Sequence, residues 1–156
     1  MGEVVGRFFV QGRPRTKGSL TPQMSRGAGG KLRVHLVESG EYAVPWKRTM
    51  IREIKGLAAA GEMHFGYAGA VSVNASFIFE QEVGADGEVW PSHRTPYPTA
   101  IDIGDLDKLL RNLLDALTQS GLIKDDSQVA QISSVKQWRK PHLHKAAGVL
   151  VEVRAL

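Results

Sequence analysis

The sequence contains no cysteine, and this absence excludes several classes of protein at once. Without cysteine there is no disulfide framework, no thiolate zinc site and no cysteine nucleophile. Also missing are an apolar run of eighteen or more residues and a start that resembles a secretion signal. We therefore expect a soluble, intracellular protein without membrane contact. A chain of 156 residues suits a single domain, residues 1–156, with one core.

Acidic residues are scarce outside the middle of the chain. Residues 1–60 carry eleven Lys/Arg against four Asp/Glu, residues 61–126 four against eleven, and residues 127–156 five against one. Basic flanks suggest a polyanion as partner, because Lys and Arg contacts to phosphate dominate nucleic-acid affinity. The acidic centre would repel that partner unless its carboxylates hold divalent cations. The alternative is charge scattered over unrelated, solvated faces.

Hydrophobic periodicity predicts elements in the order β, β, α, β, α, β, β. The expected strands are 3–10, 31–37, 71–79, 128–138 and 146–153, the expected helices 39–60 and 105–120, and the expected long loops 11–30 and 80–104. In 31–37, apolar and basic residues alternate, which predicts one apolar and one basic face. The order indicates an α+β domain, a small mixed sheet with helices packed on it.

The expected helix 105–120 has the strongest pattern in the chain. Its leucines recur at helical spacing and form one continuous apolar face: Leu106, Leu109, Leu110, Leu113, Leu114 and Leu117. Gly121 suits a left-handed helix end. This face is predicted to lie in the core.

Two pairs of aspartates flank this helix: Asp105 with Asp107, and Asp125 with Asp126. They could be structural, as helix-end charges, as an ion pair of Asp107 with Arg111, or as turn residues. If instead the two pairs converge, carboxylates about 4 Å apart repel by roughly 4 kcal/mol per pair at an effective dielectric of 20, so a cation is required. Oxygen ligands favour Mg²⁺ or Mn²⁺. The residues alone leave both interpretations open.

The run DLDKLLRNLLDALTQSGLIKDDSQV resembles the signature of the RusA family of Holliday-junction resolvases. In that family a D-[LI]-D-[NK]-L opening is followed by L-D-A-L, a glycine turn and D-D-x-Q-V. Weaker similarity covers GRPRTKGS, PSHRTPYPT and VKQW. The resemblance implies a RusA-like endonuclease that resolves Holliday junctions or other branched DNA. It would do so by paired, Mg²⁺-dependent phosphodiester hydrolysis, as a homodimer in the cytoplasm of a bacterial or phage-infected cell.

The same resemblance implies a set of site residues. Asp105, Asp107 and Asp126 would be catalytic and would ligate Mg²⁺, with Mn²⁺ as a substitute. Arg111 matches the functional lysine of the family, and because arginine keeps its charge, we assign it electrostatic work only. The family has Lys-Pro before the first aspartate, whereas this chain has Ile-Gly at 103–104, so we expect a more flexible approach to Asp105.

A set of basic side chains is predicted to hold the DNA arms: Arg13, Arg15, Lys17, Arg26, Lys31, Arg33, Lys47, Arg48, Arg52, Lys136, Arg139 and Lys140. His93 and Arg94, in the loop 80–104, are further candidates for DNA contact. Trp138 is expected in the core. No nucleotide cofactor is expected, because GRPRTKGS departs from the order of a phosphate-binding loop.

Two other functions remain open at this stage. The chain could be a structure-selective DNA-binding protein with little or no turnover, because arginine replaces the family lysine. It could also be a general metal-dependent nuclease without preference for junctions.

Overall fold

The computed structural model describes residues 2–18, 20–38 and 41–156. A four-stranded mixed sheet forms its centre, in the order β1 (Val4–Gln11), β6 (Gly148–Ala155), β4 (Val71–Phe79) and β5 (Val129–Trp138). β4 and β5 are parallel, and the other neighbours are antiparallel. The α+β prediction with a small mixed sheet is confirmed.

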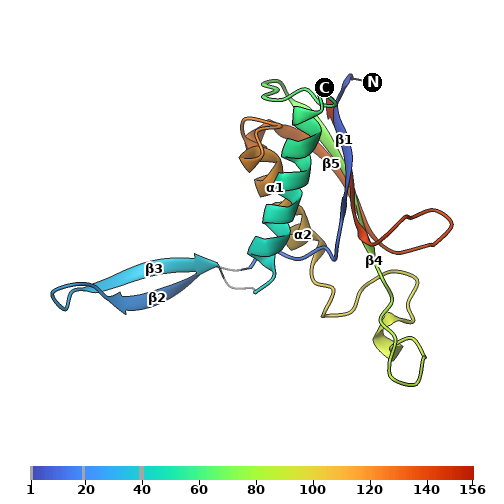
Figure 1. Cartoon of the computed structure of the whole chain (residues 1–156), viewed down its shortest axis with the longest axis horizontal. Helices are drawn as coiled ribbons and strands as arrows, with labels where there is room; N and C mark the ends of the chain where they lie inside the picture. Colours follow the sequence, from blue (N-terminus) through green and yellow to red (C-terminus); the bar gives the residue numbers. More distant parts are fainter. Residues whose placement is uncertain (1, 19, 39–40) are drawn as a thin grey trace.

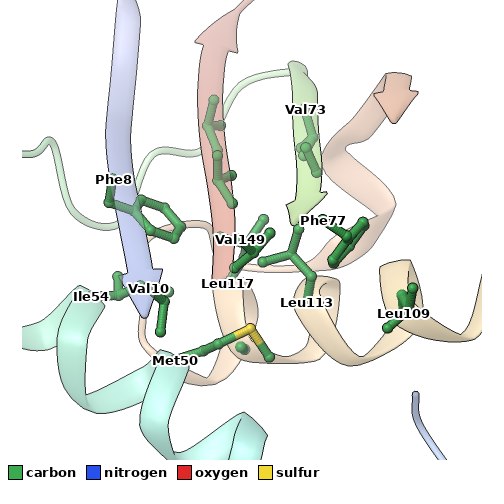
Figure 2. Close-up of a cluster of buried hydrophobic side chains, with 14 of the residues drawn as sticks. Phe8, Val10, Met50, Ile54, Val73, Phe77, Leu109, Leu113, Leu117 and Val149 are labelled. Atoms are coloured by element: carbon green, nitrogen blue, oxygen red, sulfur yellow. The ribbon is translucent and has the colours of Figure 1, made fainter. Parts of the chain in front are cut away.

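Two helices complete the core, α1 (Ala43–Ala59) and α2 (Leu106–Gln119), and they pack against each other (Figure 1). A parallel pair of strands needs a long crossover, and α2 lies within the one that joins β4 to β5. Alternate side chains of β4 are buried, as its period-two sequence predicts. Figure 2 shows side chains of both helices and of the sheet meeting in one cluster.

The leucine face of α2 lies in this core, as predicted. Leu109, Leu113 and Leu117 are at most 1% exposed, and Leu106, Leu110 and Leu114 pack against the cluster as partly buried side chains. Each fully buried leucine contributes about 1.5–3 kcal/mol of hydrophobic stabilisation. α2 is therefore firmly packed in the body of the protein, and this packing fixes the position of the residues at its start.

A separate hairpin, β2 (Leu20–Arg26) with β3 (Leu32–Glu38), projects away from this body (Figure 1). The prediction of a loop over 11–30 is therefore wrong for β2. Its residues show no regular alternation, and the strand exists through antiparallel pairing with β3. The turn between the strands contains Gly29 and Gly30 at φ +82° and +76°, where residues with a side chain are strained.

The apolar face of β3 is not part of the core. Leu32 and Val34 are 60% and 65% exposed, and Met24, opposite Val34, is 69% exposed. The alternation of apolar and basic residues holds, but the side chains described on both faces of the hairpin, within residues 22–35, meet solvent.

The ends of the helices agree with their sequence signals. α2 has Asp105 as its N-cap and Ser120 as its C-cap, and Gly121 follows at φ +83°. α1 begins after Tyr42 and has Pro45 in its first turn, while residues 39 and 40 of the expected helix lie outside the described residues. No helix in the described ranges is long and apolar enough to cross a membrane.

Candidate active site at the start of helix α2

Asp105 lies at the beginning of α2. Although it occupies the N-cap position, its side chain makes no capping hydrogen bond. The carboxylate is 69% exposed, and its partner is the ammonium of Lys108, 3.4 Å away. Such an exposed pair contributes little to stability. The carboxylate is thus available to a ligand at low cost.

Asp107 occupies the first turn of α2. Its carboxylate is 63% exposed and lies 3.6 Å from the guanidinium of Arg111, which is 68% exposed. The ion pair expected between residues four apart is therefore present. Because both groups face solvent, the pair is weak and leaves the two side chains free to exchange partners.

The second pair of aspartates begins the short 3-10 helix η2 (Asp126–Gln128), which lies close to α2. Asp125 caps η2, because its carboxylate accepts the Ser127 N–H at 2.8 Å. Asp125 therefore has the structural role in a turn that was one of its two interpretations. Hydrogen bonds from Ser127 lower the pKa of the Asp125 carboxyl below its ordinary value. Asp126 is exposed and carries no such capping role.

The carboxylates have the chemistry of a magnesium site, but they are not gathered into a three-ligand group. Within the ranges that the structure describes, no three acidic or histidine side chains lie close enough together to hold a metal ion. Mg²⁺ is commonly held by one or two carboxylates, with water and substrate phosphate completing its shell. Asp105 and Asp107 have separate basic partners, Lys108 and Arg111, and metal binding by Asp105, Asp107 and Asp126 stays a prediction.

A polar cleft of about 360 Å³ opens beside Asp105. Its volume lies in the lower part of the ~300–1,000 Å³ range typical of ligand pockets. The described residues that line it are Thr16, Thr99, Ala100, Ile101, Gly104, Asp105, Lys108 and Lys136. Lys108 was not among the residues predicted for the site, although its position three residues after Asp105 is a signal that could have found it.

The approach to Asp105 is held by several contacts, in contrast to the flexibility expected from Ile-Gly at 103–104. Ile103 is 4% exposed. The carbonyl of Gly104 accepts a hydrogen bond from the Lys136 ammonium at 2.9 Å. Asp102 receives the guanidinium of Arg13, whose Nη2 lies 3.2 Å from both its backbone and its side-chain oxygen.

His93 also fixes this approach, and the prediction that it contacts DNA is wrong, because it is 0% exposed. Its Nδ1 accepts the Glu82 N–H at 2.9 Å, so Nε2 carries the proton and donates to the Asp102 carboxylate at 3.1 Å. The ring lies between Trp90 and Trp138, with centroids 5.4 and 4.9 Å away. Trp138 is 7% exposed, which confirms its predicted place in the core.

The segment before the hairpin runs along α2 and does not belong to a free loop. The Lys17 N–H donates to the Lys108 carbonyl at 3.0 Å, and the Asn112 side chain donates to the Arg15 carbonyl at 3.1 Å. The Lys17 ammonium lies 2.7 Å from Asp115. This segment therefore forms one wall of the site.

Several predicted DNA-binding residues have partners within the body of the protein: Arg13, Arg15, Lys17, Lys136 and Arg139. The Arg15 guanidinium lies 4.4 Å from the centre of the Tyr42 ring. Burial, with repulsion from Arg13 as a smaller cause, lowers the pKa of Arg15 below its ordinary value.

The other members of that set lie on the hairpin, on α1 and just after β5, and most of them face solvent. The hairpin carries Arg26, Lys31 and Arg33, α1 carries Arg48 and Arg52 with half-buried Lys47 beside them, and Lys140 follows β5. A projecting ribbon and a helix side can both reach a DNA backbone. DNA contact by these residues stays a prediction.

Comparison with known protein families matches residues 30–154 to the family described as Endodeoxyribonuclease RusA. The match covers most of the chain, so the protein belongs to this family, as its aspartate-rich signature predicted. The family consists of endodeoxyribonucleases that resolve Holliday junctions. A search of curated proteins found no match.

Proposed function

We propose that this protein is a Mg²⁺-dependent endodeoxyribonuclease that resolves four-way DNA junctions, with its active site at the start of α2. The observation that carries the proposal is the pair of exposed carboxylates, Asp105 at the N-cap and Asp107 in the first turn, at the start of a helix anchored by buried leucines. A site on an anchored helix keeps its geometry when a large, flexible substrate binds. The polar cleft beside Asp105 gives the backbone of that substrate a place to enter.

Asp105 and Asp107, with Asp126 from η2, would hold the Mg²⁺. Once bound there, Mg²⁺ supplies an acidified water and neutralises charge on the reacting phosphate. One of the carboxylates, with Asp126 as the candidate, accepts the proton that the attacking water loses. Arg111 is 68% exposed, and its ion-pair partner among the described residues is Asp107, so it can turn its guanidinium to a phosphate oxygen.

Mn²⁺ fits the same ligands, because carboxylate oxygens suit both ions. Binding of Mg²⁺ to Asp105 and Asp107 would neutralise their charge. Their ion pairs with Lys108 and Arg111 would then weaken. Both basic side chains become available to DNA. Each carboxylate therefore binds either its basic side chain or the metal ion, and the two kinds of binding compete.

A homodimer is part of the proposal. A four-way junction has approximate two-fold symmetry, and a two-fold dimer places one active site on each of two opposed strands. Paired nicks on opposed strands then resolve the junction into two duplexes. Sedimentation of the protein, alone and with a synthetic junction, measures the number of chains per complex.

The test is cleavage of a synthetic four-way junction by the purified chain with and without Mg²⁺. We expect paired nicks that require the metal and disappear in Asp107→Asn, while binding of the junction persists. Glu53→Gln, the same loss of charge on the exposed side of α1, is the matched control and should cleave normally. Full cleavage by Asp107→Asn would refute the site, and equal cleavage of a linear duplex would indicate a general nuclease.

One observation favours a second candidate, a structure-selective DNA-binding protein with little turnover. The described residues form no three-ligand metal group, and Asp105 and Asp107 are each paired with a basic side chain. In that case the parent chain binds junctions but does not cut them, and Arg111→Lys should introduce cleavage. Cleavage by the parent chain excludes this candidate.

A further inference from the structure

Two ammonium groups from different elements line the cleft beside Asp105. Lys108 comes from α2, and Lys136 comes from β5. An ammonium has three donors, and Lys136 uses one of them on the Gly104 carbonyl, 2.9 Å away. Among the described residues, the ion-pair partner of the Lys108 ammonium is the exposed Asp105 carboxylate, 3.4 Å away. Both side chains therefore keep donors for a ligand in the cleft.

The lining of this cleft suits an anion. Its charged side chains are two lysines and one aspartate, a net charge of +1, and the hydroxyl-bearing residues Thr16 and Thr99 accompany them. Among the described lining residues there is no arginine, and Arg111 instead lies near Asp107 on the exposed side of the helix. The basic residue of α2 that shares the cleft with Asp105 is therefore Lys108.

We infer that this cleft receives the reacting phosphate of the DNA backbone, with Lys108 and Lys136 as its cationic walls. The inference rests on the proposed nuclease function and adds a phosphate site to it. Lys108 turns from the Asp105 carboxylate to a non-bridging phosphate oxygen when a phosphate enters the cleft. The cost of this exchange is small, because the pair that is broken is exposed: 44% of Lys108 and 69% of Asp105 face solvent.

Lys108 thus contributes to the charge neutralisation for which Arg111 is the other candidate. A donor aimed at the oxygens of a reacting phosphate acts mainly in the transition state. Its removal is expected to lower kcat about 100-fold and to leave KM within about threefold. Removal of a long-range DNA contact would instead raise KM.

The first experiment needs no nuclease activity. Inorganic phosphate is titrated into the isotopically labelled chain without Mg²⁺, and amide signals of residues 99–101 and 104–108 are followed. We expect saturable shifts at these residues, with half-saturation about tenfold higher in Lys108→Gln and unchanged in Lys124→Gln, an exposed lysine outside the cleft. No shift in the parent chain, or a larger loss in Arg111→Gln than in Lys108→Gln, would overturn the inference.

The second experiment measures junction cleavage by the same variants with saturating Mg²⁺. Lys108→Gln should lose about 100-fold in kcat, whereas Lys124→Gln should match the parent. Normal kcat in Lys108→Gln would overturn the catalytic part of the inference. If the parent chain cuts no DNA, the proposed function fails, and the phosphate titration still decides whether the cleft is an anion site.

Discussion

The buried imidazole of His93 donates a hydrogen bond to the carboxylate of Asp102, 3.1 Å away. This contact joins the connection after β4 to the residues that lead into α2. Asp102 is three residues before Asp105, so the pair helps to fix where the proposed active site begins. Arg13 binds the same carboxylate from a third segment, near the end of β1.

Replacing His93 by alanine should destabilise the protein strongly. The substitution leaves a cavity beside two tryptophan rings and removes the partner of the Glu82 N–H and one of the partners of Asp102. We expect a loss of about 3 kcal/mol in the free energy of unfolding, measured by urea denaturation. His35→Ala, an exposed site on the hairpin, should change it by less than about 0.5 kcal/mol. A comparable effect of the two substitutions would contradict this account.

Gly104→Ala should cost more stability than Gly87→Ala, although both glycines have similar positive φ, +88° and +81°. A Cβ at Gly104 overlaps the methyl of Thr16, whereas a Cβ at Gly87 meets no atom within 4 Å. We expect losses of about 1 kcal/mol for Gly87→Ala from backbone strain and about 1–3 kcal/mol more for Gly104→Ala from overpacking. Urea denaturation measures both. Adding Thr16→Ser to Gly104→Ala should recover part of the difference, and no recovery would argue against the clash.

The regular elements were predictable wherever packing on one face sets a period. β4 coincides with the predicted strand 71–79, because alternate residues of this strand are buried. α2 follows its leucines to within a residue at each end. β2 could not be foreseen, because its strand form depends on pairing with β3 and not on a buried face.

The candidate site was predictable only in part, for a related physical reason. The exposure of Asp105 follows from its place outside the leucine face of the helix, and Asp107 lies at the border of that face. The cleft does not follow from any local pattern, because Thr16 and Lys136 come from distant segments that meet only in the fold. The burial of His93 likewise depends on partners in other parts of the chain, such as Trp138.

The contribution of Asp125 to stability should depend on pH. Hydrogen bonds from Ser127 lower the pKa of its carboxyl in the folded protein. Because this pKa is lower in the folded than in the unfolded protein, ionised Asp125 stabilises the fold fully at pH values above 3.8, the ordinary pKa of the carboxyl. This stabilisation is lost as the pH falls through the pKa of the folded protein. Asp125→Asn keeps a capping oxygen and should melt at a lower temperature than the parent near neutral pH. The two melting curves should converge in strong acid, and a constant difference would exclude this charge effect.

The hairpin should supply much of the salt-dependent affinity for DNA. Residues 20–37 contain no Asp or Glu, and Arg26, Lys31 and Arg33 are exposed on a ribbon that stands away from the body (Figure 1). Substituting these three residues by glutamine should lower the slope of log affinity against log salt by roughly one for each phosphate that the hairpin no longer binds, up to about three. The control replaces three exposed lysines elsewhere by glutamine: Lys55, Lys124 and Lys145.

Both triple variants lose the same charge, so the comparison separates local contact from net charge. If DNA binding only follows the overall charge of the protein, the two slopes fall equally, and the hairpin has no special role. If the hairpin touches the backbone, only its own variant releases fewer counterions, and the control keeps nearly the parent slope. Fluorescence anisotropy of a labelled four-way junction, measured at several salt concentrations without Mg²⁺, distinguishes the two outcomes while preventing cleavage.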